Sequence, residues 1–262
     1  MKYPINYFII LSFLYFFSAC RTIQTNQSEI VQLNAILNNS SNNTDIYIGI
    51  SPTMRIYEKE VENAKMHIAH QIAIQRNCIV DTGALYILEG KNNFYFSDYG
   101  FDYCDDDIDE IVGNLDVLNV YKFQELIIVI GRDTSKPSTA SINIPRIPSE
   151  RPRWINDLQW VRKLLGQGYF AGIGIADKYT QFYKGIYVAD IEAAQAIASE
   201  KGTSINMYTQ DLVVNKSTKY SAGTLSMTEN IELEGFYILD RWIDPDNETF
   251  YSLGIANKRI LK

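Results

Sequence analysis

The two histidines of the chain, His67 and His70, are the first candidates for chemistry. They lie three residues apart in a segment with helical hydrophobic spacing, off the apolar stripe of Val61, Ile68 and Ile72. Paired zinc-binding histidines on a helix are usually four residues apart, and a metal site needs further ligands. We therefore expect both to be solvent-facing or interdomain polar residues. With so few histidines, a histidine-based nucleophile triad is not expected either.

Carboxylates gather in two places. The run from Asp102 to Glu110 lacks the alternating ligands and the central glycine of a calcium loop. We interpret it as a solvated turn, with Asp105 to Asp107 at the N-terminus of a helix, where negative charge is favourable. A weaker cluster of Asp244, Asp246 and Glu248 is typical of a hairpin turn. No metal site is predicted.

Gly172 and Gly174 end an apolar strand that precedes a helix, as in a phosphate-binding loop. The third glycine of the dinucleotide-binding pattern would fall at position 177, which is Asp177, and a carboxylate there repels phosphate. We expect these glycines to mark strand positions where a neighbouring element crosses closely. No cofactor is predicted.

The cysteines are Cys20, Cys78 and Cys104. Cys20 follows an apolar stretch from Tyr7 to Phe17, too short to span a membrane but typical of a secretory signal. The segment Phe17-Ser18-Ala19-Cys20 resembles the lipobox of bacterial lipoproteins. That resemblance implies cleavage before Cys20, acylation of this residue, and anchoring through its acyl chains. An ordinary signal peptide with a chance cysteine at the cleavage site is the alternative.

Export would place Cys78 and Cys104 in an oxidising compartment, where they could form a disulfide; a free buried thiol is the open alternative. Neither is a good nucleophile, since no histidine is near in sequence and carboxylates surround Cys104. Arg21 stands where some lipoproteins carry an aspartate that retains them in the inner membrane. Because Arg21 replaces this aspartate, the sequence favours the outer membrane, on the periplasmic face or the cell surface.

Composition limits the partners. The formal charge of −7 argues against nucleic acid, which requires a basic face, and against electrostatic docking on anionic lipid. Aromatic side chains are numerous, with a cluster between Phe94 and Tyr103 that could line a ligand groove or a protein contact. Alternation along that cluster indicates that half of these rings face a core.

The elements that position these residues occur twice. A strand followed by an Ala-rich helix at Tyr169–Ser199 matches a segment 125 residues upstream without a gap, so that Ile50 aligns with Ile175 and Ala69 with Ala194. Ile128 and Ile130 match Leu253 and Ile255 at the same offset. We expect an α+β protein with two tandem units, each an antiparallel sheet packed on one main helix.

The expected domain boundaries follow from this repeat. Residues 1–19 are a lipoprotein signal peptide, 20–45 the lipidated cysteine and a flexible tether, 46–133 the first unit, 134–153 a Pro-rich linker and 154–262 the second unit. Expected helices cover about 30–37, 55–76, 153–165 and 181–200, the last stopping at Gly202. Expected strands cover 46–51, 78–88, 94–103, 115–123, 126–130, 169–176, 204–214, 232–243 and 250–257.

Several segments together resemble the Lpp-twenty family of bacterial envelope lipoproteins and the related N-terminal domains of the flagellar T-ring protein. The segments that carry the resemblance are Pro152–Ile155, Tyr169–Ala176, Ala193–Ala198, Trp242–Asp244 and Tyr251–Gly254. It covers about 152–258 well and 46–133 more weakly. It implies an exported, lipid-anchored α+β domain resembling dodecin, and it brings no catalytic residue.

Together these features predict a non-enzymatic, lipid-anchored cell-envelope protein that mediates protein contact or envelope structure. An unknown envelope protein is the expected partner, and homo-oligomers are open. The alternative is a lipoprotein that binds a small molecule in a pocket between the two units.

Overall fold

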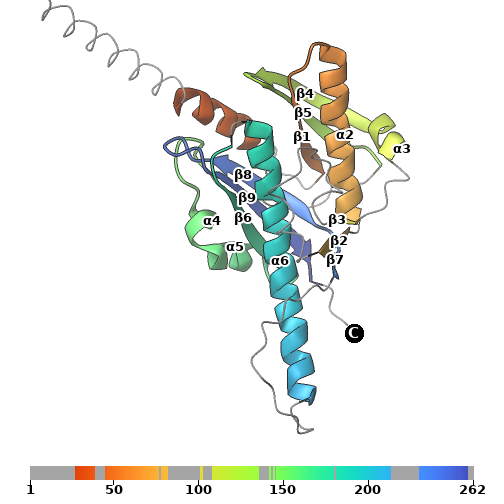
Figure 1. Cartoon of the computed structure of the whole chain (residues 1–262), viewed down its shortest axis with the longest axis vertical. Helices are drawn as coiled ribbons and strands as arrows, with labels where there is room; N and C mark the ends of the chain where they lie inside the picture. The colour runs from red at the N-terminus through yellow and green to blue at the C-terminus, as the bar shows by residue number, and fades with distance from the viewer. Residues whose placement is uncertain are drawn as a thin grey trace, which may run out of the picture.

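The computed structural model describes residues 27–38, 45–76, 78–81, 101–102, 108–135, 142, 144, 146–179, 181–213 and 230–258. Helices packed on small antiparallel sheets make up this part of the chain, which confirms the α+β class (Figure 1). The signal peptide and Cys20 lie outside the described residues, as do Asp105 to Asp107, Cys104 and most of the aromatic cluster at 94–103.

The first half of the chain forms a three-stranded sheet in the order β1-β5-β4, with β1 at Ile46–Pro52, β4 at Leu115–Phe123 and β5 at Leu126–Asp133. Helix α2 (Tyr57–Arg76) covers one face, and its buried residues Ala64, Ile68 and Ile72 form the predicted apolar stripe. The short helix α3 (Ile108–Gly113) packs on α2. The helix expected at 55–76 and the hairpin with its turn at Gln124 are confirmed.

The second half repeats this order. Strands β6 (Tyr169–Ala176), β9 (Phe250–Asn257) and β8 (Tyr237–Ile243) form a sheet in the order β6-β9-β8, again antiparallel. The long helix α6 (Phe182–Val213) covers one face of this sheet. Two short helices, α4 (Arg153–Asn156) and α5 (Leu158–Leu165), precede β6.

The close approach between strand and helix is the same in both halves. A Cβ atom on Gly49 of β1 would lie 1.9 Å from the carbonyl oxygen of Ala64 in α2, and one on Gly174 of β6 would lie 1.8 Å from that of Ala189 in α6. Both glycines and both alanines are 125 residues apart. The prediction that Gly174 marks a close crossing, rather than a phosphate loop, is confirmed.

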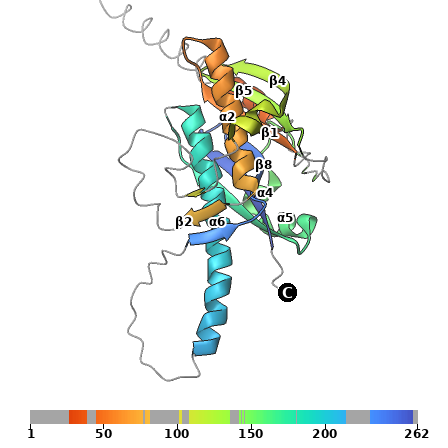
Figure 2. The ribbon, with the colours of Figure 1, turned by 90° about the vertical axis from the view of Figure 1, so that its right-hand side faces the viewer.

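A third small sheet joins the halves. Strand β2 (Cys78–Asp81) follows α2 and pairs on one side with β3 (Phe101–Asp102) and on the other with β7 (Asn230–Leu233). Figure 2 shows β2 and the blue β7 side by side next to α6. A segment of the second half therefore completes a sheet begun by the first half.

Three expectations about local structure are wrong. Helix α6 does not stop at Gly202 but continues to Val213, so the strand expected at 204–214 is helical. One interior glycine costs a helix only about 1 kcal/mol. The packing of the preceding turns of α6 on the sheet outweighs this cost.

The strand expected at 232–243 is two strands, because Gly235 adopts a positive φ of 68° and redirects the chain between β7 and β8. The helix expected at 153–165 is broken at Asp157, whose carboxylate caps α5 by accepting from the Trp160 backbone N–H at 2.9 Å.

The segment expected to be a flexible tether contains a packed helix over residues 27–38, around the short helix anticipated at 30–37. Its apolar side chains Ile30, Leu33 and Leu37 are buried. They join a hydrophobic cluster with Ile48 and Ile128 of the first sheet, and Ile186 of α6 belongs to the same cluster. The first sheet is thus covered by α2 on one face and by this cluster on the other.

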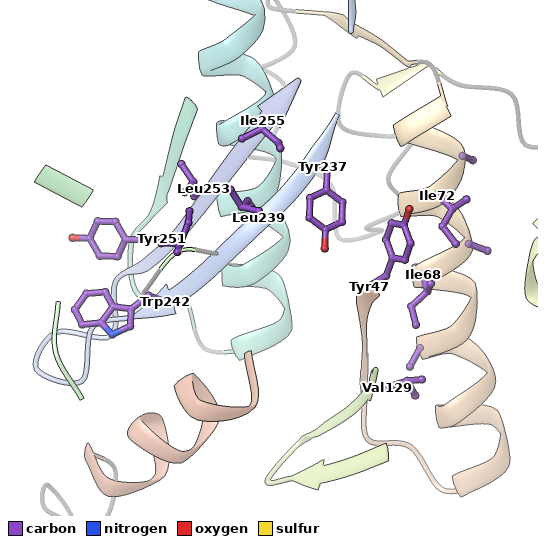
Figure 3. Close-up of a cluster of buried hydrophobic side chains, with 14 of the residues drawn as sticks. Tyr47, Ile68, Ile72, Val129, Tyr237, Leu239, Trp242, Tyr251, Leu253 and Ile255 are labelled. Atoms are coloured by element: carbon purple, nitrogen blue, oxygen red, sulfur yellow. The ribbon is translucent and has the colours of Figure 1, made fainter. Parts of the chain in front are cut away.

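The largest hydrophobic cluster also extends across both halves. Tyr47 of β1 and Tyr237 of β8 point toward one another between the two sheets (Figure 3), with ring centroids 5.6 Å apart in an edge-to-face arrangement. Ile68 and Val129 lie on the side of Tyr47, while Leu239 and Leu253 lie on the side of Tyr237. The two halves share one core.

Candidate functional site

His67 is buried rather than solvent-facing, with 5% of its surface exposed. Its Nδ1 accepts a hydrogen bond from the Ile50 backbone N–H at 3.0 Å, which requires Nδ1 to be unprotonated. Its ring lies edge-on to Tyr187 of α6, with centroids 4.4 Å apart. Of the two predicted environments, the interdomain one is therefore confirmed for His67. Burial, assisted by the charges of Arg241 and His70, holds the pKa of His67 well below its ordinary value.

His67 belongs to a set of side chains that cover the free edge of β1. Gln71 donates from Nε2 to the Ile48 carbonyl at 2.8 Å, and the Tyr187 hydroxyl donates to the Ile50 carbonyl at 2.6 Å. The Tyr237 hydroxyl donates to the Ile46 carbonyl. An uncovered strand edge would leave backbone groups unpaired inside the molecule. Residues from α2, α6 and β8 satisfy these groups.

The free edge of β8 is covered in the same way. Asn34, from the helix at 27–38, donates from Nδ2 to the Ile243 carbonyl at 2.8 Å and accepts from the Ile243 N–H at 2.8 Å. Arg146 donates to the Arg241 carbonyl and to the backbone carbonyl of Asn34. Arg146 comes from the segment expected to be a linker, where Ile144 is also buried. Part of the predicted linker is therefore core.

Two buried ion pairs lie at this junction. Arg241 of β8 forms a bidentate pair with Asp190 of α6, with Nε–Oδ1 and Nη2–Oδ2 distances of 2.9 and 2.8 Å. Ser252 of β9 donates to the same carboxylate at 2.6 Å, and Arg241 also donates to Gln71 of α2 at 3.3 Å. Bidentate guanidinium–carboxylate pairs are among the strongest charged hydrogen bonds. This one links three elements of the second half to the main helix of the first.

The second pair joins Arg146 and Asp240, with Nη1 and Oδ1 3.0 Å apart and both side chains fully buried. Trp154 of α4 donates from Nε1 to the other oxygen of Asp240 at 2.8 Å. Burial raises the pKa of Asp240, while Arg146 opposes this rise. Burial also lowers the pKa of Arg146. We refer to Asn34, His67, Gln71, Arg146, Tyr187, Asp190, Tyr237, Asp240, Arg241 and Ser252 as the buried polar junction.

A cavity of about 10 Å³ lies against the buried polar junction, and the residues that line it include Gln71, Asp190 and Tyr237. A cavity of this size holds at most one water molecule. The polar side chains named here hydrogen-bond to one another or to the backbone, so their arrangement fastens the elements together.

Cys78 is a buried thiol, and burial raises its pKa to about 12, which suits a structural residue rather than a nucleophile. Because Cys104 lies outside the described residues, its pairing with Cys78 stays a prediction.

Among the described residues, no three His, Cys, Asp or Glu side chains come close enough to hold a metal ion. No helix within these residues is long and apolar enough to cross a bilayer.

The hairpin role of the second carboxylate cluster is confirmed. Asp244 accepts from the Asp246 backbone N–H at 3.0 Å, and its own N–H donates to the Thr249 carbonyl at 2.8 Å. These bonds close the turn between β8 and β9. The sequence analysis missed Arg146, Asp190, Asp240 and Arg241. The available signal was the pair Asp240-Arg241 inside the otherwise apolar run Tyr237–Ile243, because adjacent charges in a buried strand require partners.

Comparison of the chain with protein-family models, with curated proteins and with solved structures gave no match. The resemblance to the Lpp-twenty family therefore stays a prediction that rests on the residues named above.

Proposed function

We propose that this is a non-enzymatic, lipid-anchored cell-envelope protein that acts through protein contacts or as part of the envelope structure. The observation that carries the anchor is the sequence Phe17-Ser18-Ala19-Cys20 directly after an apolar stretch. Acylated Cys20 would be the membrane partner, since two or more acyl chains give stable attachment. The absence of aspartate after this cysteine favours the outer membrane.

We further propose that the folded part consists of two tandem dodecin-like units. The equal strand orders β1-β5-β4 and β6-β9-β8 support this interpretation. So does the shared spacing of 125 residues between Gly49 and Gly174 and between Ala64 and Ala189, which make the same strand–helix contact in each half.

A role without catalysis is supported by what the buried charges do. Asp190 and Asp240 each bind an arginine, and His67 binds a backbone N–H. Charged groups that serve catalysis would face a cavity able to admit a substrate. The alternative function, binding of a small molecule between the two units, would need a larger space than the water-sized cavity beside Gln71 and Tyr237.

The anchor is tested by comparing the intact mass and membrane fractionation of wild type with those of Cys20→Ser. We expect the wild type to carry the mass of its acyl chains and to require detergent, and Cys20→Ser to lose both properties. Cys104→Ser is the matched control and should leave both unchanged. If Cys20→Ser alters neither mass nor fractionation, the protein is not a lipoprotein.

The contact role is tested by affinity purification of the full-length protein from detergent-solubilised envelope. A reproducible envelope-protein partner, or a second copy of this chain, is the expected result. A thermal shift of the purified protein produced only by metabolites, with no co-purifying protein, would instead favour the small-molecule alternative.

A further inference from the structure

Three large apolar side chains are exposed together where β1 leads into α2, two in the connecting loop and one at the first residue of α2. Met54, Ile56 and Tyr57 expose 53%, 48% and 50% of their surface. We call residues 54–57 the apolar loop; Arg55 is its one polar member. Single exposed apolar residues are ordinary, but several in one short segment mark a contact surface.

The apolar loop is held firmly in place. The Thr53 N–H donates to the Glu125 carbonyl at 2.7 Å, at the turn between β4 and β5. The Met54 N–H donates to the carboxylate of Glu60, which is buried in the first turn of α2. The Glu60 N–H in turn donates to the Ile56 carbonyl at 3.2 Å. These hydrogen bonds hold the backbone that carries the exposed side chains in a defined conformation.

This loop lies at the end of the molecule from which the chain leads toward Cys20. The helix at 27–38 begins close to this loop. Its residue Glu29 accepts a hydrogen bond, through its carboxylate, from Gln124, the neighbour of Glu125. Figure 1 shows the start of α2 and the helix at 27–38 at the upper end, with the far end of α6 pointing the opposite way. Gln27 at the start of this helix also donates to Asp246 at 3.1 Å.

The distance to the anchor is short. Six residues, 21–26, separate Cys20 from Gln27. Even fully extended, this length of chain spans at most about 25 Å. If Cys20 is acylated, as proposed above, this end of the molecule must stay close to the bilayer surface.

We propose that the apolar loop contacts the lipid bilayer itself, with Met54, Ile56 and Tyr57 entering the headgroup region beside the acyl anchor. This inference rests on the proposed lipid anchor. The charges of Arg55 and Lys59 are matched by those of Glu58 and Glu62, so the loop has no basic patch to attract anionic lipid. The contact is driven by apolar burial, and it should depend little on salt or on anionic headgroups.

The test places an environment-sensitive fluorophore on Ile56→Cys in the acylated full-length protein, reconstituted in vesicles of zwitterionic phospholipid. The matched control is Leu164→Cys on α5, since Leu164 is similarly exposed at 45% and α5 lies away from the upper end (Figure 1). Wild-type protein treated identically gives the background from Cys104, while Cys78 is buried. Circular dichroism checks that both variants fold as wild type does.

We expect the fluorescence emission of the probe at position 56 to be shifted to the blue in vesicles and to be quenched by lipid-attached quenchers. The emission of the probe at position 164 should show neither change. Adding anionic lipid or raising the salt concentration should alter neither result. An aqueous signal at position 56 in vesicles that hold acylated protein would overturn the inference and leave the anchor intact. Shielding of this position in native envelope but not in vesicles would also overturn it, in favour of a protein partner. Failure of the anchor is recognised separately, by an unacylated mass and no vesicle association.

Discussion

Asp190 illustrates at the residue scale how this molecule tolerates charge in its core. Its carboxylate accepts hydrogen bonds from Arg241 and from Ser252, and its side chain is almost fully buried. Burying an ion is expensive unless a partner of opposite charge and further hydrogen bonds compensate for the lost water. Removing one partner of the pair should therefore destabilise the protein far more than replacing both partners with apolar side chains would.

We predict that Asp190→Asn lowers the free energy of unfolding by about 3–5 kcal/mol, because it leaves the Arg241 guanidinium buried without a counter-charge. Urea denaturation of the detergent-solubilised protein measures this loss. The control is Lys178→Gln, which removes a pair with Glu248 in which Lys178 is 66% exposed; such surface pairs contribute at most about 1 kcal/mol. Equal effects of the two substitutions would contradict the structural role of Asp190.

His67 gives a pH-dependent prediction. Its folded-state pKa is lowered by burial, and by Arg241 and His70, so the folded protein resists a proton that the unfolded chain accepts below about pH 6.5. The stability from neutral His67 is present above this pH and is lost as pH falls below it, toward the folded-state pKa. The slope is at most about 1.4 kcal/mol per pH unit.

Comparison with His67→Gln isolates this effect, because glutamine retains an acceptor for the Ile50 N–H but does not titrate. We expect the free energy of unfolding of wild type to fall more steeply than that of His67→Gln between pH 7 and 5.5. Asp240, whose pKa is raised, acts in the opposite direction at lower pH and is common to both proteins. Parallel curves would show that His67 is not buried as a neutral group.

At the scale of elements, the tight strand–helix crossings determine how closely α2 and α6 approach their sheets. A side chain at Gly174 would meet the Ala189 carbonyl oxygen at 1.8 Å and the Ala193 backbone nitrogen at 2.4 Å. Both are backbone atoms, which cannot move aside as a flexible side chain does. The glycine and the Ala-rich helix surface therefore require each other.

We predict that Gly174→Ala destabilises the protein by about 1–3 kcal/mol or more, the usual cost of overpacking a well-packed core. Gly168→Ala, just before the same strand, is the matched control, since nothing lies within 4 Å of a Cβ atom there. Thermal unfolding followed by circular dichroism compares the two. A Gly174→Ala variant as stable as the control would mean that α6 packs farther from β6.

At the scale of the whole molecule, the two halves are fastened together by more than a linker. Strand β7 of the second half pairs with β2 of the first, Tyr47 packs on Tyr237, and Gln71 of α2 binds Arg241. The helix at 27–38 adds Asn34, which caps β8 while its neighbours pack on the first sheet. Neither half is complete by itself.

We therefore predict a single cooperative unfolding transition. All three tryptophans, Trp154, Trp160 and Trp242, lie in the second half, so their fluorescence reports on that half alone, whereas far-UV circular dichroism reports on both. The two signals should give the same midpoint in urea. A biphasic dichroism curve, or a fluorescence midpoint shifted from it, would show that the halves unfold independently.

Much of the fold could be predicted from local patterns. The apolar spacing of α2, the alternation in β4 and the continuous apolar run of β5 appear in short windows of sequence, and so does the glycine pattern of β6. The end of α6 could not be predicted, because glycine commonly ends a helix but is also tolerated inside one at a small cost in stability. The break at Gly235 depends on pairing between β7 and β2, strands about 150 residues apart.

The candidate site was far less predictable than the fold. Arg241 finds its partners 51 and 170 residues away, and Asn34 caps a strand 209 residues away. No local period encodes such contacts, so the role of His67 as a cap on β1 could not be predicted from the sequence.

By itself, the sequence determined the features that depend on residue type and spacing: the lipobox-like segment at Cys20, the 125-residue repeat, and the glycines that allow close packing, since these are properties of neighbouring residues. Only the tertiary structure decided which strand edges face each other, which side chains cover them, and which charges pair in the core. Hydrogen bonds and ion pairs between distant segments require atoms to meet within about 3 Å, and only folding brings them together.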